Sequence, residues 1–136
     1  MNPVIIQNTF AKIAPQKEAF VDTFYNTLFE RYPGVKPLFQ NVDWDTQKSM
    51  LVGALATVVK NAHAPESIVE TLKKMGERHV KYGAKPEHYP AVGECLLYAL
   101  QKFLGDDWNA EVEQNWTEAY QLVSGTMIEG MRGAAA

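Results

Sequence analysis

Cysteine is nearly absent from this chain of 136 residues, which contains one, Cys95. A single thiol cannot form a disulfide within the chain, and it cannot supply the paired thiolates of a zinc or iron–sulfur site. A chain without disulfides depends on its apolar core for stability and suits a reducing compartment. We therefore predict a cytoplasmic protein in which Cys95 is a small buried apolar side chain.

Basic clusters and long apolar runs are also missing. The 13 Lys and Arg residues face 16 Asp and Glu residues, so the net charge is −3, and no stretch of the sequence is strongly basic. Nucleic acids and acidic membrane surfaces attract basic clusters, so neither is an expected partner. No apolar run approaches the roughly 20 residues of a membrane span, and residues 1–6 lack the basic start of a signal peptide.

Apolar residues, by contrast, are plentiful, at 46% of the chain with 11% aromatic. This composition supports a packed core, and the length suits one domain. We predict a single domain over residues 1–132. The last four residues, 133–136, carry no side chain that could anchor them, so we expect a disordered tail.

The spacing of the apolar residues predicts an all-α protein. They recur at intervals of three and four residues between clusters of Pro and Gly, and no stretch alternates as a strand would. A short helix is expected before Pro15 and a tight turn after Pro33, and Asp45 is expected to cap the third helix. The longer helices are predicted over residues 16–32, 45–62, 65–83, 87–104 and 110–131. Their unequal lengths argue against a symmetric four-helix bundle.

Among the three histidines, only His79 lies on the inward row of a predicted helix. His63 falls in a loop and His88 at a helix start, so both are expected in solvent. A lone histidine on an apolar face is often a core residue bonded to a backbone carbonyl, and this alternative stays open. A di-iron site needs Glu three residues before His, but Gly76 and Lys85 occupy those positions.

Two polar residues, Tyr25 and Gln47, share the inward rows with apolar side chains. Taken alone, Tyr25 is a structural aromatic residue and Gln47 a solvated residue at a helix start. Together with one buried imidazole and many aromatic residues, however, they suit a flat apolar cavity such as a haem pocket. The three tryptophans are expected to be packing residues: Trp44, Trp108 and Trp116.

Several motifs occur in a characteristic order. They are Phe24-Tyr25, Pro33 followed six residues later by Phe39, Gln47 four residues before Leu51, and Gly76-Glu77-Arg78-His79 followed by His88-Tyr89-Pro90. This ordered set resembles bacterial globins and is most similar to single-domain globins of the flavohaemoglobin lineage. The resemblance extends from the first helix to about Met127. It implies a globin fold of six to eight helices around a haem b pocket.

The resemblance also implies a role for each matching residue. His79 would be the proximal iron ligand, Phe39 would wedge against the haem, and Leu51 would stand over the iron. Tyr25 and Gln47 would form the distal polar pair. Gln47 lies 32 residues before His79. This interval matches the spacing between distal and proximal residues in the family that the chain resembles, which favours Gln47 over Thr46 as the distal residue. The remaining residues implied to line the haem are Leu72, Met75, Tyr89 and Val92.

The implied function is reversible binding of dioxygen, for transport, storage or scavenging, with nitric oxide and carbon monoxide as further ligands. Flavohaemoglobins convert nitric oxide to nitrate, but this chain stops after its globin region, so a separate reductase would be needed. A glutamate on their last helix supports the proximal side, whereas that position here counts to Met131, with Glu129 out of register. Three alternatives stay open: a gas sensor, a redox haem protein with weak peroxidase activity, and a helical interaction module without cofactor.

Overall fold

The computed structural model describes residues 1–135, and every regular element in that range is helical. The α-helices are α1 (Pro3–Ile13), α2 (Lys17–Arg31), α3 (Trp44–Lys60), α4 (Val69–Lys81), α5 (Tyr89–Leu104) and α6 (Ala110–Ala135). Short 3₁₀ segments connect them: η1 (Ala14–Gln16), η2 (Pro33–Phe39), η3 (Pro65–Ile68), η4 (Pro86–His88) and η5 (Gly105–Asp107). The prediction of an all-α protein is confirmed.

The prolines determine how several of these helices begin. Pro65 and Pro86 each open a 3₁₀ turn, so α4 and α5 start a few residues later than predicted. Proline provides no backbone N–H, which is tolerated in a first helical turn. The predicted turn after Pro33 is the 3₁₀ segment η2. Helix α6 extends over residues 133–135 of the expected tail, and residue 136 lies outside the described range.

The cap of α3 differs from the prediction. Asp43, rather than Asp45, occupies the cap position, and its carboxylate accepts hydrogen bonds from the Asp45 amide and the Thr46 hydroxyl, both at 3.2 Å. A capping side chain accepts a hydrogen bond from the amide of the second or third residue of the helix. Asp45 is therefore the second residue of α3, and Trp44 is the first. The expectation that Asp45 caps the helix is therefore wrong, and α3 begins at Trp44.

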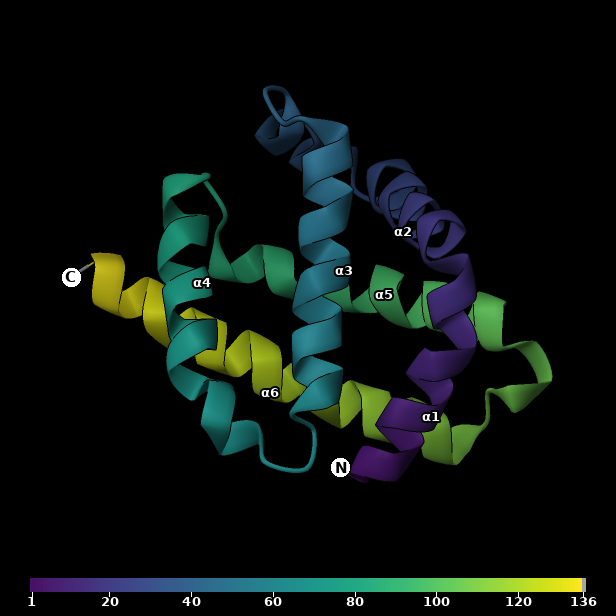
Figure 1. Cartoon of the computed structure of the whole chain (residues 1–136). Helices are drawn as coiled ribbons and strands as arrows, with labels where there is room; N and C mark the ends of the chain where they lie inside the picture. The colour runs from purple at the N-terminus through teal and green to yellow at the C-terminus, as the bar shows by residue number, and fades with distance from the viewer. Residues whose placement is uncertain (136) are drawn as a thin grey trace.

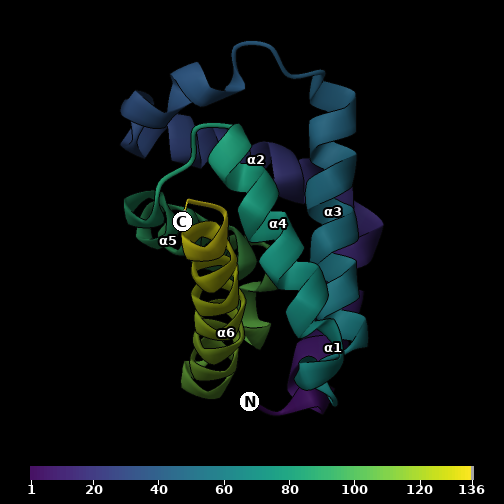
Figure 2. The same ribbon diagram turned by 90° about the vertical axis from the view of Figure 1, so that its left-hand side faces the viewer.

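Helices α4 and α6 pack together more closely than ordinary side chains allow. A β-carbon placed on Gly76 would overlap the Met127 carbonyl oxygen, and one placed on Gly130 would overlap the Lys73 carbonyl oxygen. The two glycines therefore let the two backbones touch. In Figure 1 both α3 and α4 cross in front of α5 and α6, and the turned view of Figure 2 places α4 between α6 and α3.

The buried side chains form two separate clusters. The larger joins α1, α2, α5 and the first half of α6, and it includes Phe20, Cys95 and Trp116. The complete burial of Cys95 confirms the prediction made for it. The smaller cluster lies between α4, α5 and the second half of α6, around Leu72 and Met127.

Apolar side chains lie between the two clusters without being fully covered. Leu51 and Leu55 of α3 pack against the larger cluster, while Val58 and Met75 pack against the smaller one, and all four are only half-buried. Helix α3 contributes a single buried residue, Val59, despite its apolar sequence. The core thus consists of two separate clusters, and half-buried apolar side chains lie between them. Within residues 1–135, no helix has the length and apolar character needed to cross a membrane.

Candidate functional site

His79 lies near the end of α4, and its orientation is fixed by the helix itself. Its Nδ1 is 2.6 Å from the carbonyl oxygen of Met75, one turn earlier. A carbonyl oxygen can only accept, so Nδ1 carries the proton and donates it. The other ring nitrogen, Nε2, therefore keeps its lone pair, which is the state that binds a metal.

The surroundings of His79 also keep its ring uncharged. Burial lowers the pKa of the imidazole; the hydrogen bond to the Met75 carbonyl opposes this shift, and the positive charge of Arg78 adds to it. A neutral imidazole is the form that ligates a metal. His63 is exposed, as expected. His88 is partly exposed and accepts a hydrogen bond from the Lys85 amide at 3.0 Å in an exposed contact.

A metal held by His79 would need ligands from elsewhere. Among residues 1–135, no group of three or more His, Cys, Asp or Glu side chains is placed to hold an ion. A single imidazole is a sufficient protein ligand when the other positions are filled by a macrocycle, as in haem.

Tyr25 and Gln47 come from different helices and meet in the structure. Tyr25 lies on α2 and Gln47 in the first turn of α3, and the Gln47 Nε2 donates a hydrogen bond to the Tyr25 hydroxyl oxygen at 3.1 Å. Burial raises the pKa of Tyr25, and the hydrogen bond from Gln47 offsets part of the shift. The phenol therefore keeps its proton and can donate it. The neighbouring Thr46 is exposed and bonds to Asp43 instead.

Aromatic rings surround Tyr25 on the side of η2 and α3. The ring centre of Phe39 is 5.8 Å from that of Tyr25, and the ring centre of Trp44 is 5.2 Å away, both in edge contacts. Phe39 and Trp44 are stacked on each other, with 5.9 Å between centres and 12° between planes. Phe29 contacts all three rings. Trp44 is thus a neighbour of the candidate site as well as a packing residue.

The other residues implied to line the pocket fall into two groups. Leu72 and Tyr89 are buried in the smaller cluster, and Met75 borders it. Leu51 and Val92 border the larger cluster and are half-buried. The incompletely covered side chains Leu51, Met75 and Val92 therefore lie where a further apolar group can be added to the core.

Tyr89 carries a buried hydroxyl group that has no hydrogen-bond partner within residues 1–135. Its desolvation raises the pKa of Tyr89 to about 12. Met131 is buried in the same cluster as Tyr89, whereas Glu129 is exposed and lies outside that cluster. A buried hydroxyl without a partner costs about 1–3 kcal/mol, so a missing group that accepts its hydrogen bond is expected here.

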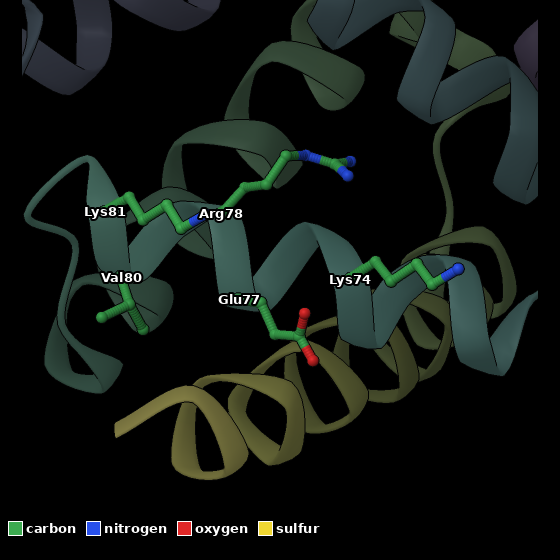
Figure 3. A pocket seen from close by; sticks show the side chains of 5 residues that line it. All are labelled: Lys74, Glu77, Arg78, Val80 and Lys81. Carbon is green, nitrogen blue, oxygen red and sulfur yellow. The ribbon is translucent and has the colours of Figure 1, made fainter. Parts of the chain in front are cut away.

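Two cations next to the site were not singled out by the sequence. Lys74 and Arg78 directly precede Met75 and His79 on α4, and in Figure 3 Arg78 extends away from α6 while Lys74 extends toward the start of α4. Neither forms an ion pair within residues 1–135. They border a surface hollow of about 520 Å³ lined also by Glu77, Val80 and Lys81. In the sequence, this pair could have been noticed from the spacing of four residues between the two cations.

These features together fit a haem group. The half-buried apolar side chains of α3, α4 and α5 can cover a macrocycle, and the neutral His79 imidazole can hold its iron. The unpartnered Tyr89 hydroxyl and the unpaired Lys74 and Arg78 can interact with its polar edge. The hollow beside Lys74 and Arg78 is also lined by Glu77 and Lys81, so its cations outnumber its one carboxylate.

Comparisons with known proteins agree with this fit. The model of the globin family matches residues 22–127. The flavohemoprotein of Bacillus subtilis is 31% identical over 126 residues, covering 91% of this chain and 32% of the relative. The flavohemoprotein of Xylella fastidiosa strain 9a5c is 32% identical over 122 residues, covering 88% of this chain and 30% of the relative. The chain therefore spans about a third of the length of these curated relatives.

Two solved structures share the whole fold. A bacterial globin from Campylobacter jejuni superimposes with a TM-score of 0.85 at 28% identity, covering 98% of this chain and 96% of the other. An engineered carbene transferase made from a candidate nitric oxide dioxygenase of Rhodothermus marinus gives a TM-score of 0.86 at 26% identity, covering 98% and 92%. With a family match over most of its length, the chain belongs to the globin family.

Proposed function

We propose that this globin binds haem b through His79 and binds dioxygen reversibly next to Tyr25 and Gln47. The observation that carries the proposal is the 3.1 Å hydrogen bond that joins Gln47 of α3 to Tyr25 of α2, next to the rings of Phe39 and Trp44. The motifs are most like those of Hell's Gate globin, a single-domain member of the flavohaemoglobin lineage. We further propose that residues 1–132 are the functional domain and that the protein works in the cytoplasm.

Haem, when bound, supplies an iron atom that takes up diatomic gases. Dioxygen gains partial negative charge in such a site, so hydrogen-bond donors stabilise it. The Tyr25 hydroxyl and the Gln47 amide are two such donors, because burial keeps the phenol protonated. A hydrogen bond to a charged acceptor contributes about 1.5–3 kcal/mol, which slows dioxygen release roughly 10- to 100-fold per donor. Carbon monoxide carries little charge and gains less.

The other residues position the cofactor and exclude water. The Met75 carbonyl holds the His79 ring in one orientation, so its Nε2 lone pair points in a fixed direction. Leu51, Met75 and Val92 provide an apolar surface that keeps water from the site. Lys74 and Arg78 would receive the propionate carboxylates.

The test is to supply haem to the purified protein and record its absorption spectrum with and without dioxygen and carbon monoxide. We expect an intense haem band that shifts with each gas. His79→Ala should lose this ligation, whereas His63→Ala, which changes an exposed histidine, should not. A protein without a haem band, or a His79→Ala variant with unchanged ligation, would contradict the proposal.

A second candidate function is nitric oxide dioxygenation, in which nitric oxide, dioxygen and one electron yield nitrate. It is supported by the flavohemoprotein relatives and by the structural match to a candidate nitric oxide dioxygenase. The reaction consumes one electron, and we propose that a reductase supplies it. Nitrate formation should then continue for many turnovers with a supplied reductase, and a rate that stops after one turnover would exclude the activity.

A further inference from the structure

A chain of aromatic rings leads from the buried Tyr25 to the protein surface at Trp44. Tyr25 is only 5% exposed, whereas Trp44 is 37% exposed. Their ring centres are 5.2 Å apart, and Phe39 contacts both, at 5.8 Å from Tyr25 and 5.9 Å from Trp44. The buried end of this chain is the residue that also meets Gln47 in the candidate gas site.

The exposed indole of Trp44 is held in a fixed position. It is the first residue of α3, directly after the cap Asp43, and its ring stacks on Phe39 with only 12° between the planes. The indole is 37% exposed, so part of the ring reaches solvent while the rest packs against the rings behind it. A ring that touches both solvent and the buried rings can pass an electron between them.

The charges around Trp44 favour the loss of an electron from its indole. The residues on either side are Asp43 and Asp45, both exposed carboxylates. Lys48, one turn along α3, is paired with Asp22 at 2.6 Å, so its charge is compensated. Nearby negative charges stabilise a positive charge on the ring. They also attract neutral or positively charged donors in preference to anionic ones.

Tyr25 is less suited to hold the oxidised state. A phenol releases its proton when it loses an electron, and the Gln47 Nε2 bonded to the Tyr25 oxygen donates and cannot take that proton. The same proton is the one that Tyr25 is proposed to donate to the ligand in the gas site, so oxidation of Tyr25 would remove that donor. An indole can keep its positive charge. Oxidation that begins in the gas site is therefore expected to settle on Trp44, with the rings of Tyr25 and Phe39 acting as a bridge.

We propose that Trp44 is a surface oxidation site through which small neutral or cationic aromatic amines deliver electrons to the haem pocket when a peroxide is the oxidant. Hydrogen peroxide accepts two electrons and two solvent protons and is converted to two waters. Two amine molecules each lose one electron at Trp44 and leave as radical cations. The inference rests on the proposed binding of haem and adds a substrate site that is separate from the gas site.

The test uses the haem-loaded full chain with hydrogen peroxide and a nitroso spin trap, followed by mass spectrometry of the peptides. We expect the trap to be attached mainly to Trp44, and to be lost from that peptide in Trp44→Phe, which keeps an aromatic ring in the stack. Trp108→Phe is the matched control, because Trp108 lies outside the aromatic chain and should leave labelling of Trp44 unchanged. Labelling spread evenly over other Trp and Tyr residues would overturn the proposal.

Kinetics with two donors provide an independent readout. Trp44→Phe should slow oxidation of tetramethyl-p-phenylenediamine several-fold, and raising the salt concentration should slow the native protein with a cationic aromatic amine but not with anionic ferrocyanide. Equal rates in Trp44→Phe and the native protein would overturn the proposal. The absorption spectrum separates the two ideas: no haem band contradicts haem binding, while a normal gas-responsive band with unlabelled Trp44 contradicts the surface site alone.

Discussion

At the scale of single residues, His79 and Tyr25 are both kept uncharged by burial, and each needs that state for its proposed role. Burial lowers the pKa of the imidazole and raises that of the phenol, so both groups are neutral near pH 7. Each also has one fixed hydrogen bond, His79 to the Met75 carbonyl and Tyr25 from the Gln47 amide. The imidazole keeps a free lone pair and the phenol keeps a free proton.

Tyr25→Phe should accelerate dioxygen dissociation about 10- to 100-fold, because it removes a donor worth about 1.5–3 kcal/mol to a charged acceptor. Carbon monoxide dissociation should change much less. Stopped-flow measurements of both gases on the same preparation provide the comparison. Tyr98→Phe, which changes a partly exposed tyrosine of α5, is the control. Equal changes for the two gases would show that the hydroxyl does not act as a donor.

The assignment of Gln47, rather than Thr46, as the distal residue can be tested in the same way. Gln47→Ala should accelerate dioxygen dissociation several-fold, since it removes the amide bonded to Tyr25. Thr46→Ala should leave this rate unchanged, because the Thr46 hydroxyl is exposed and bonds to Asp43. A larger effect at Thr46 than at Gln47 would reverse the assignment.

Tyr89→Phe should have opposite effects on the protein without and with haem. In the haem-free protein it removes a buried hydroxyl without a partner, so the free energy of unfolding should rise by about 1 kcal/mol. If haem supplies the missing partner, the variant should lose haem faster. Denaturant unfolding and haem transfer to an acceptor protein measure the two effects.

Tyr120→Phe is the matched control for this prediction. The Tyr120 hydroxyl donates to the Tyr89 carbonyl at 2.6 Å, so its removal should destabilise the haem-free protein. A Tyr89→Phe variant that is destabilised to the same degree would mean that its hydroxyl has a partner already.

At the scale of helices, the backbone contact between α4 and α6 decides where His79 stands. Gly76→Ala places a methyl group into the Met127 carbonyl of α6, so α4 must move and the protein should lose about 1–3 kcal/mol of stability. The iron–histidine stretching frequency should shift as well, because Gly76 lies one turn before His79. Resonance Raman spectra and thermal unfolding measure the two quantities.

Gly125→Ala is the control for the helix crossing. Gly125 also lies in α6, but a methyl group there meets nothing within 4 Å. It should stabilise the protein by about 0.5–1 kcal/mol and leave the iron–histidine frequency unchanged. An unshifted frequency in a folded Gly76→Ala protein would mean that the contact supports the fold without positioning the ligand.

The sequence predicted the helices well and their junctions less well. Apolar spacing located all six α-helices, because burial of one face imposes the period. It could not distinguish Asp43 from Asp45 as the cap, since both residue types suit that position. It also missed the 3₁₀ turns at Pro65 and Pro86, where two helical forms satisfy the same local pattern.

For the site, the sequence predicted residues that belong to motifs but not those defined by contacts between helices. The resemblance to bacterial globins implied that Tyr25 and Gln47 form a pair, and the structure brings Gln47 to Tyr25. The unpartnered hydroxyl of Tyr89 and the stacking of Trp44 on Phe39 depend on how separate helices meet, which periodicity does not encode. Lys74 and Arg78 carried only an i, i+4 pattern that ordinary solvated faces share.

At the scale of the molecule, the core consists of two clusters, so the free energy of unfolding depends on what lies between them. Leu51 and Leu55 border the larger cluster while Val58 and Met75 border the smaller one, and haem would join the two. A ligand present at a thousand times its dissociation constant adds about 4 kcal/mol. For a domain of this length we expect calorimetry to show a melting temperature roughly 10–20 °C higher with haem than without.

The stability that haem adds should be concentrated in α4. This helix is held by α6 and by the small cluster, whereas α2 and all the buried apolar residues of α5 except Tyr89 belong to the large one. Without haem, amide hydrogens of Val69–Lys81 should exchange with solvent faster than those of α2 and α5, and haem should slow α4 most. Hydrogen exchange with mass spectrometry measures this difference. Equal protection of all three helices without haem would show that the small cluster suffices to hold α4, and that the cofactor adds to a core already continuous.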